Sequence, residues 1–262
     1  MRESVGSMRP IDNDKPVVLT IAGIDPSGGA GIVADIKTIA EFGCFPAAAI
    51  TSITFQNATR VFGAEHQTAA TLRAQVEPIV QGAKVAAAKT GMLPTAEIVA
   101  EVVRLFCEED LPAPVVDPVM VSTSGHDLIG DAAFQILKND LLRVARVVTP
   151  NIPEAERLAG FSIQSEEDMK RAAEVIKSLG APAVLVKGGH RLSSQADAVD
   201  ILIDDTGAII EFREEFIDVG EVHGSGCTLS AAIAAALGQG MSLPAAVGAA
   251  KKYLTQAIRR LD

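Results

Sequence analysis

Short apolar runs rich in β-branched residues alternate with longer helix-like segments along most of this chain. Strands are expected at 17–22, 47–54, 85–89, 114–117, 145–149 and 183–187. Nearly continuous apolar strands that alternate with helices are typical of a parallel sheet whose two faces are both covered. We therefore expect an α/β fold of three layers, α/β/α, around a mostly parallel central sheet.

The remaining pattern fills in the helical layers and one hairpin. Helices are expected at 29–42, 71–82, 94–107, 132–142, 153–159, 166–179, 227–237 and 243–261. Two further strands, 198–203 and 208–212, have the spacing of a hairpin that turns through Asp205-Thr206-Gly207. Residues 1–15 are polar, and we expect them to be loose. The sequence shows no internal repeat and no low-complexity linker, so residues 16–262 are interpreted as a single domain.

Charge and composition exclude several classes of protein. The chain has 262 residues, of which 48% are hydrophobic and 21% charged, as in ordinary globular proteins. A net charge of −10 argues against a nucleic-acid partner, which needs a basic surface. We find no apolar run long enough to span a bilayer and no apolar segment typical of a signal peptide. Three cysteines without a CxxC pair fit a reducing compartment, so we expect a cytoplasmic protein without a membrane partner.

Polar and glycine-rich clusters follow the expected strands. They lie at 25–31, 56–57, 90–92, 117–118, 151–154 and 188–189. In open parallel sheets, ligands bind beyond the carboxyl ends of the strands. The clusters therefore predict one binding site at that edge of the sheet.

The segment 222–228 carries the most specific chemical signal. Gly224, Ser225 and Gly226 form a turn directly before an alanine-rich apolar run, so they are expected to begin a helix. The unpaired N–H groups and the dipole at a helix start attract an anion, and glycine lets the anion approach closely. Cys227 falls in the first turn, where the pKa of a thiol is expected to be lowered. An anion site beside a reactive group indicates phosphoryl transfer.

Four polar residues at strand ends each have a structural and a chemical interpretation. Asp117 is either a turn acceptor or a carboxylate placed for Mg²⁺. Asn151 and Glu154 have the spacing of a capping box, although a capped turn can also organise water around a metal. Lys187 is either solvated or placed to neutralise phosphate oxygens. These residues alone do not decide between the alternatives.

Several other classes of site are not indicated. The loop 23–31 misses the G-x-G-x-x-G spacing of a dinucleotide site, and the chain contains no P-loop motif. His190 and His223 have no evident carboxylate partner, so hydrolase chemistry is not indicated. Cys44 and Cys107 are interpreted as structural.

Taken together, the motifs resemble the hydroxymethylpyrimidine/phosphomethylpyrimidine kinases of thiamine biosynthesis, within the ribokinase-like superfamily. The matching segments are A-G-I-D-P-S-G-G-A-G-I-V-A-D-I-K-T (22–38), F-Q-N (55–57), K-T-G-M-L (89–93), D-P-V-M-V (117–121), T-P-N-I-P-E-A (149–155), V-K-G-G-H (186–190) and H-G-S-G-C-T-L-S-A-A (223–232). They occur in the family's order over nearly the whole chain.

The resemblance implies a ribokinase-like fold, a homodimer, and two phosphorylations of the hydroxymethylpyrimidine by ATP with Mg²⁺. The positions implied for the pyrimidine are Gly23, Ala30, Asp35, Gln56, Met92 and Val119. The positions implied for nucleotide binding are Asn151, Lys187 and Gly189, and those implied for the metal are Asp117 and Glu154. The positions implied for catalysis are Gly224, Ser225, Gly226, Cys227 and Lys187. In this scheme Cys227 accepts the hydroxyl proton or orients the alcohol.

Two other functions stay open on this scaffold. A pyridoxal kinase is the nearest alternative, and Gln56 argues against it because an amide suits an aminopyrimidine. A non-catalytic pyrimidine-binding regulator is a different class, kept open because Ser122-Thr123 replace the Ala-Lys of many family members. A nicotinamide dehydrogenase is disfavoured by the glycine spacing.

Overall fold

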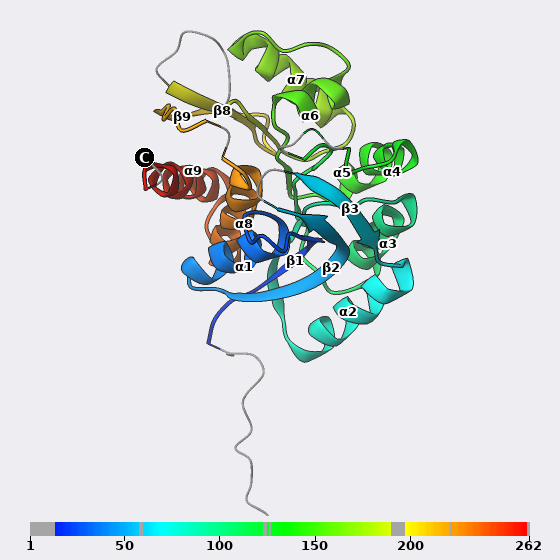
Figure 1. The fold of residues 1–262 in the computed structure, drawn as a ribbon. Helices are drawn as coiled ribbons and strands as arrows, with labels where there is room; N and C mark the ends of the chain where they lie inside the picture. Colours follow the sequence, from blue (N-terminus) through cyan, green and yellow to red (C-terminus); the bar gives the residue numbers. More distant parts are fainter. Residues whose placement is uncertain are drawn as a thin grey trace, which may run out of the picture.

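The chain folds around one nine-stranded sheet (Figure 1). The structure, a computed structural model, describes residues 14–57, 60–122, 125, 127–189, 197–220 and 222–260. The spatial order of the strands is β3-β2-β1-β4-β5-β6-β7-β8-β9. Their bounds are β1 Val17–Ile24, β2 Phe45–Gln56, β3 Val61–His66, β4 Val85–Thr90, β5 Val115–Val116, β6 Val147–Val148, β7 Val184–Lys187, β8 Asp197–Ile203 and β9 Ile209–Glu215.

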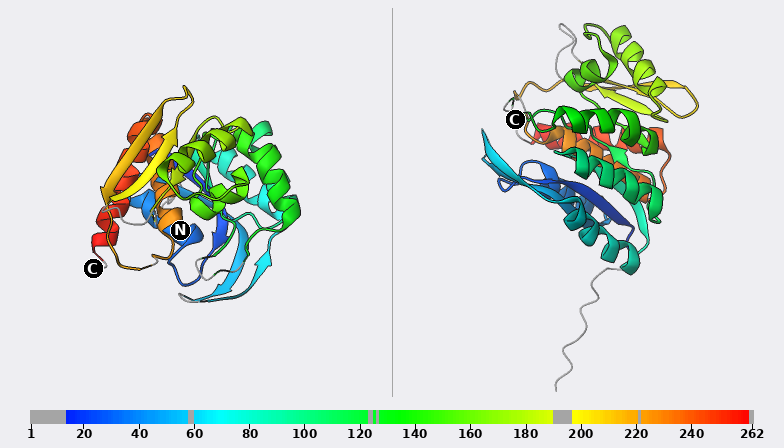
Figure 2. Two further views of the ribbon diagram at one scale, coloured as in Figure 1. Left: turned by 90° about the horizontal axis from the view of Figure 1, so that it is seen from above. Right: turned by 90° about the vertical axis from the view of Figure 1, so that its right-hand side faces the viewer.

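The middle of the sheet is parallel and both of its margins are antiparallel. Strands β2, β1, β4, β5, β6 and β7 pair in parallel. Strand β3 pairs antiparallel with β2, and β8 and β9 continue antiparallel from β7. In the right-hand view of Figure 2 the β2–β3 pair extends beyond the rest of the sheet. All parallel strands therefore end at the same edge, where the polar clusters follow them.

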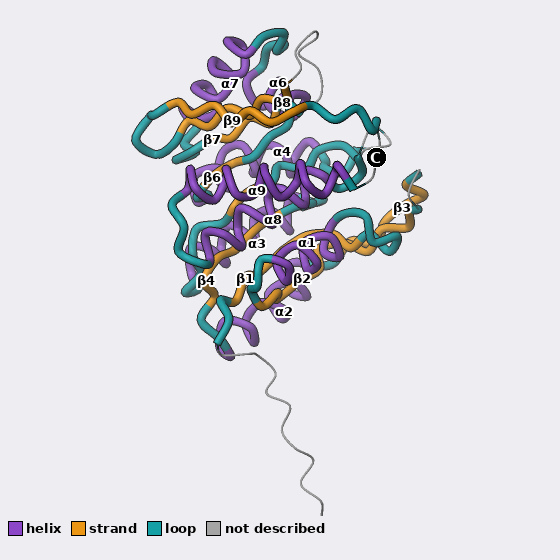
Figure 3. Tube along the Cα trace, turned by 90° about the vertical axis from the view of Figure 1, so that its left-hand side faces the viewer, coloured by secondary structure: helices purple, strands orange, loops and turns teal. Residues whose placement is uncertain are grey.

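Helices cover both faces of the sheet, as Figure 3 shows with α1, α8 and α9 in front of it. Side chains alternate along β1, so Val18 joins the core under α1, α8 and α9, while Leu19 joins the core under α2 to α7. The helices are α1 Gly31–Glu41, α2 Ala69–Gly82, α3 Ala96–Glu108, α4 Asp131–Ile136, the π-helix η1 Leu137–Leu141, α5 Leu142–Val144, α6 Ile152–Ala159, α7 Glu166–Ser178, α8 Ser225–Gly238 and α9 Leu243–Arg259.

Helix α8 lies close against the middle of the sheet because its side chains are small. The alanines from Ala231 to Ala236 are fully buried around Ile233. At Gly238 an added Cβ would lie only 3.1 Å from Val18 Cγ2 and 3.3 Å from Ala87 Cβ. This close packing fixes the start of α8 at the carboxyl edge of the sheet, beside the ends of β1, β4 and β5.

The predicted three-layer fold is confirmed, including the hairpin of β8 and β9. Two local features differ from the prediction. Strand β3 was not predicted, because 61–66 contains one β-branched residue and an internal glycine. The expected helix 132–142 contains a π-helical turn, η1. The expected loose segment 1–15 lies outside the described residues except for its last two. None of the described helices combines the length and the apolar character needed to cross a membrane.

Candidate active site

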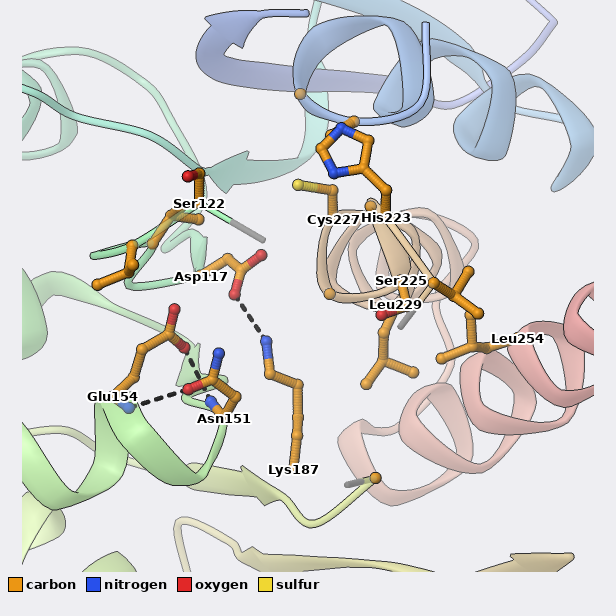
Figure 4. A pocket seen from close by; sticks show the side chains of 18 of the residues that line it. Asp117, Ser122, Asn151, Glu154, Lys187, His223, Ser225, Cys227, Leu229 and Leu254 are labelled. Carbon is orange, nitrogen blue, oxygen red and sulfur yellow. Dashed lines mark hydrogen bonds and ion pairs between the residues drawn. The ribbon is translucent and has the colours of Figure 1, made fainter. Parts of the chain in front are cut away.

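The carboxyl ends of the parallel strands open into a cavity of about 570 Å³ (Figure 4). All six polar clusters contribute at least one residue to its wall. One side is formed by the β1–α1 loop, Gln56 and Met92, and the other by the start of α6 with Lys187 and Gly189. The start of α8 and the C-terminal half of α9 close the remaining side. The cavity falls within the size range of small-molecule sites.

Two glycine-rich loops interlock where α8 begins. Gly224 has φ +82°, and a Cβ on it would lie 1.9 Å from the Gly29 carbonyl oxygen. A Cβ on Gly29 would in turn lie 2.7 Å from Cδ2 of His223. The N–H of Ser225 donates to the Val222 carbonyl at 3.3 Å, while those of Gly226 and Cys227 have no helical carbonyl before them. This loop therefore presents backbone N–H groups and the positive end of α8 to the cavity.

Changing Gly224 to alanine is expected to distort this loop. The added methyl group would overlap the Gly29 carbonyl, and alanine disfavours a positive φ. We expect the free energy of unfolding to fall by about 2 kcal/mol and ADP affinity to fall at least about tenfold. Denaturant unfolding and calorimetric titration measure the two effects. Gly240→Ala is the matched control, because Gly240 also has a positive φ but a Cβ added to it would meet nothing within 4 Å. Equal loss of ADP affinity in both variants would contradict a role of the Gly224 loop in binding the nucleotide.

Lys187 and Asp117 form an ion pair at the floor of the cavity, with Lys187 Nζ 2.9 Å from Asp117 Oδ1. Their side chains are 11% and 2% exposed. Asp117 also accepts hydrogen bonds from the hydroxyls of Ser230, at 3.1 Å, and Thr149, at 3.4 Å. Burial opposes ionisation of Asp117, but Lys187 and Lys89 outweigh it and lower its pKa. The pair is therefore charged at neutral pH, with the ammonium beside Gly226.

Asn151 and Glu154 form the predicted capping box at the start of α6. The Glu154 N–H donates to Asn151 Oδ1 at 2.9 Å, and the Asn151 N–H donates to Glu154 Oε2 at 2.8 Å. Burial raises the pKa of Glu154 to about 7, against the opposing charge of Lys187. Both residues also line the cavity, so they cap α6 and belong to the candidate site at the same time.

The predicted lowering of the Cys227 pKa is wrong. Burial raises the pKa of this thiol to about 11, and the carboxylates of Asp35 and Asp117 add to the effect. Lys89 and the Gly31 N–H oppose the rise without cancelling it. The sulfur nevertheless points into the cavity, as Figure 4 shows. Cys227 is therefore a protonated thiol at neutral pH in the ligand-free protein.

Alkylation with iodoacetamide tests this protonation state. Only the thiolate reacts, and its fraction rises about tenfold per pH unit below the pKa. We expect Cys227 to react slowly at pH 7 and progressively faster towards pH 10. The exposed Cys107 is the internal reference. Peptide mass spectrometry measures both rates, and a Cys227 that reacts faster than Cys107 at pH 7 would contradict the raised pKa.

The residues predicted to contact the pyrimidine divide into two groups. Five of them line the cavity: Gly23, Ala30, Gln56, Met92 and Val119. Asp35 does not, because it lies fully buried behind the wall. Its carboxylate accepts hydrogen bonds from Lys89 Nζ at 2.8 Å and from the Thr20 hydroxyl at 2.6 Å. In the structure the Asp35 carboxylate forms a buried ion pair with Lys89, and its predicted contact with the pyrimidine stays a prediction.

Two carboxylates that line the cavity, Asp25 and Asp200, were given no role of their own in the sequence analysis, although Asp25 lies in the cluster 25–31. Asp25 Oδ2 lies 3.0 Å from His223 Nε2, so the expectation that His223 lacks a carboxylate partner is wrong. Asp200 accepts a hydrogen bond from the Gly188 N–H at 2.9 Å and pairs with Lys251 of α9 at 2.7 Å. The His223–Asp25 pair joins residues 198 positions apart, and no local pattern reveals it. The predicted histidine His190 lies outside the described residues.

Comparison with known proteins places this fold among the small-molecule kinases of the ribokinase-like class. The chain belongs to the phosphomethylpyrimidine kinase family, whose model matches residues 25–261. It is 43% identical to the hydroxymethylpyrimidine/phosphomethylpyrimidine kinase of Streptomyces coelicolor over 243 residues, which cover 93% of this chain and 88% of that protein.

Solved structures of two kinds of kinase are also similar. The phosphomethylpyrimidine kinase from Clostridium difficile 630 matches with a TM-score of 0.82 and 40% identity, covering 93% of this chain and all of that one. The pyridoxal kinase from Staphylococcus aureus, in complex with AMP-PCP and pyridoxal, matches with a TM-score of 0.84 and 34% identity, covering 93% and 88%.

Proposed function

We propose that this protein transfers the γ-phosphoryl group of ATP to 4-amino-5-hydroxymethyl-2-methylpyrimidine. A second transfer to the monophosphate gives the pyrimidine pyrophosphate used in thiamine biosynthesis. The observation that carries the proposal is the start of α8, where backbone N–H groups, Lys187 and the Cys227 thiol face one cavity. The ATP-analogue complex of the Staphylococcus aureus relative supports ATP as the donor.

The proposed mechanism is in-line transfer, in which positioning and charge stabilisation supply most of the catalysis. The N–H groups of Gly226 and Cys227 bind the transferring group. The Lys187 ammonium exchanges part of its contact with Asp117 for the phosphate oxygens and stabilises their charge. The Cys227 sulfur faces the acceptor hydroxyl and orients it. In its thiolate form it accepts the hydroxyl proton as that oxygen bonds to the γ-phosphorus and the bond from the phosphorus to the leaving ADP breaks. Asn151 and Gly189 line the nucleotide side of the cavity.

Asp117 and Glu154 are the residues that would hold Mg²⁺. Within the described ranges no three side chains of His, Cys, Asp or Glu gather in a way that could hold a metal ion. Two carboxyl groups fit Mg²⁺ that arrives with nucleotide phosphates and keeps several waters. When bound, the ion would neutralise phosphate charge. Glu154, with a pKa of about 7, would be held ionised by that positive charge.

We also propose that the protein is a homodimer. Ile53 and Phe55 of β2 are 43% and 50% exposed, and Phe62 of the edge strand β3 is 64% exposed. Exposed apolar side chains along an edge strand are typical of a surface that another chain covers. Sedimentation equilibrium is expected to give twice the chain mass, and a single chain mass at assay concentration would contradict the dimer.

Pyridoxal phosphorylation is the second candidate, because pyridoxal kinases are as similar in structure as the pyrimidine kinase is. Both activities are measured by ADP release with Mg²⁺ and ATP. We expect kcat/KM for the hydroxymethylpyrimidine to exceed that for pyridoxal at least about tenfold. The reverse order would favour the pyridoxal kinase. Binding of the pyrimidine without any ADP release would identify a non-catalytic regulator.

A further inference from the structure

Asp200 on β8 connects the end of β7 with helix α9. Its Oδ1 accepts the N–H of Gly188 at 2.9 Å, and its Oδ2 lies 2.7 Å from Lys251 Nζ. Both charged side chains are only 7% exposed, and both line the cavity. Replacing a buried ion pair by apolar residues of similar size is often neutral for stability. Stability alone therefore does not account for a buried pair in the wall of the site.

The hydrogen bond between Gly188 and the Asp200 side chain lies just beyond the end of β7. Lys187 is the last residue of that strand, and it pairs with Asp200 across the two strands. A Cβ on Gly188 would lie 2.0 Å from the Val199 carbonyl oxygen, so the two backbones approach too closely here for any residue but glycine. The carboxylate of Asp200 thus holds the chain at the point where it leaves the sheet.

Two hydrogen bonds fix the backbone on both sides of the Lys187 Cα. The Lys187 N–H donates to the Pro150 carbonyl oxygen at 2.8 Å. On the other side, the Gly188 N–H donates to Asp200. Because each peptide group is planar, fixing the two that flank a Cα also fixes the direction of its Cα–Cβ bond. The Lys187 side chain is thereby directed towards Asp117, as Figure 4 shows, with its ammonium 2.9 Å from Oδ1.

The place of this ammonium bears directly on nucleotide binding. It lies 3.2 Å from where a Cβ on Gly226 would be, beside the backbone N–H groups at the start of α8. A misplacement of about 1 Å can cost a positioned group about 100-fold in rate. Whatever fixes the Lys187 backbone therefore decides how well the ammonium meets a γ-phosphoryl group.

We propose that Asp200, held in place by Lys251, is a positioning residue that directs the Lys187 ammonium to the γ-phosphoryl group of the nucleotide. The Lys251 ammonium occupies one carboxylate oxygen, which leaves the other turned towards Gly188. Without that acceptor, the peptide group after Lys187 is free to rotate, and the ammonium loses its fixed place. The inference rests on the proposed function, because it acts through the phosphate contact of Lys187.

Two double variants separate the hydrogen bond from the ion pair. Asp200→Leu/Lys251→Met and Asp200→Asn/Lys251→Met both remove the two charges, so neither leaves a buried charge without its partner. Only the amide of the second variant offers an oxygen to the Gly188 N–H. Calorimetric titration with AMP-PCP, which has a γ-phosphoryl group, and with ADP, which has none, measures the nucleotide contacts.

Asp200→Leu/Lys251→Met is expected to bind AMP-PCP about tenfold more weakly than the wild-type protein and ADP less than about threefold more weakly, because one positioned charge contact to the γ-phosphoryl group is lost. Asp200→Asn/Lys251→Met should stay within about threefold of the wild-type protein for both nucleotides. A merely structural role would lower both affinities alike. Equal AMP-PCP affinity in the two double variants, or an equal loss of ADP and AMP-PCP in the first, would overturn the inference.

A thermodynamic cycle tests whether Asp200 acts through Lys187. Lys187→Met alone is expected to weaken AMP-PCP binding about tenfold. Adding Asp200→Leu/Lys251→Met to it should cost less than about twofold more, because the group that Asp200 positions is already absent. A further loss of about tenfold would show that the two residues act independently, and would overturn the inference.

Asp204→Leu is the matched control. Asp204 directly follows the other end of β8, is 8% exposed, and accepts the N–H groups of Thr206 and Ala208 outside the cavity wall. The substitution removes a carboxylate that binds backbone N–H groups in the same hairpin. This control should keep the wild-type affinity for both nucleotides, and denaturant unfolding reports the stability of each variant.

A further measurement needs no variant. Hydrogen exchange followed by NMR is expected to show a protected Gly188 N–H in the wild-type protein, and free exchange of this proton would overturn the inference. Failure of the proposed function gives a different result: the nucleotides bind with the expected contrast between variants, but no ADP is released in the presence of the pyrimidine. A wild-type protein that binds neither nucleotide would overturn both.

Discussion

Replacing Lys187 by methionine is expected to lower kcat by two to three orders of magnitude. The methionine side chain keeps the length of the stem but removes the ammonium that lies 2.9 Å from Asp117 Oδ1 and beside Gly226. Losing one positioned electrostatic contact to a transition state costs about 100-fold to 1000-fold in kcat. ADP release at saturating ATP and pyrimidine measures the effect.

The same substitution is expected to destabilise the fold, because it leaves the Asp117 carboxylate buried without its ion-pair partner. Removing one partner of a buried pair costs about 3–5 kcal/mol, and we expect the lower end because Ser230 and Thr149 keep their hydrogen bonds. The matched control is Lys170→Met, which removes the surface pair of Lys170 with Glu211 at 3.1 Å. This control should keep full kcat and should lower the free energy of unfolding much less than Lys187→Met does, because solvent screens an exposed pair. More than a third of wild-type kcat in Lys187→Met would refute the role of Lys187.

Replacing Cys227 by alanine is expected to lower kcat at least about 100-fold and to change KM for the pyrimidine less than about threefold. The reason is that the sulfur orients the alcohol for reaction and, in its thiolate form, accepts the proton in the transition state. Cys44→Ala is the matched control, since Cys44 is a buried thiol that hydrogen-bonds to Ala235 in the same helix, α8. The control is expected to lose stability but not kcat. Unchanged kcat in Cys227→Ala would show that the Cys227 sulfur neither orients the alcohol nor accepts its proton.

The raised pKa of Cys227 gives this prediction a pH dependence. The thiolate fraction rises as pH approaches about 11, so proton acceptance by the sulfur predicts a wild-type kcat that increases between pH 7 and pH 9. The Cys227→Ala variant should lack that increase. A flat wild-type profile would restrict Cys227 to orienting the alcohol.

The architecture was predictable because its signal repeats locally. Apolar strands that alternate with helices fix a parallel sheet, and the carboxyl ends of such strands must share an edge. The glycine turn before the alanines of α8 predicted an anion site for the same reason: the motif and its structural consequence lie within a few residues. The capping box of Asn151 and Glu154 was likewise readable from spacing alone.

The features that sequence reasoning missed depend on groups far apart in the chain. The Cys227 pKa follows from burial beside Asp35 and Asp117, which a helix-start argument leaves out. Asp35 is bound by Lys89, 54 residues away, and is therefore withdrawn from the cavity. The pair of Asp25 and His223 connects the β1–α1 loop with the segment just before α8, which are 198 positions apart in the chain. Strand β3 was not predicted, because its own composition does not favour a strand and its extended structure depends on pairing with β2.

In the proposed mechanism, the N–H groups at the start of α8 hold the transferring phosphoryl group while the Cys227 sulfur faces the acceptor alcohol. A crystal structure with ADP, aluminium fluoride, Mg²⁺ and the hydroxymethylpyrimidine measures this directly. We expect fluoride ligands within hydrogen-bond distance of the Gly226 and Cys227 N–H groups and of Lys187 Nζ, with the hydroxymethyl oxygen beside the sulfur. A fluoride group bound elsewhere in the cavity, or a hydroxymethyl group turned away from Cys227, would contradict it.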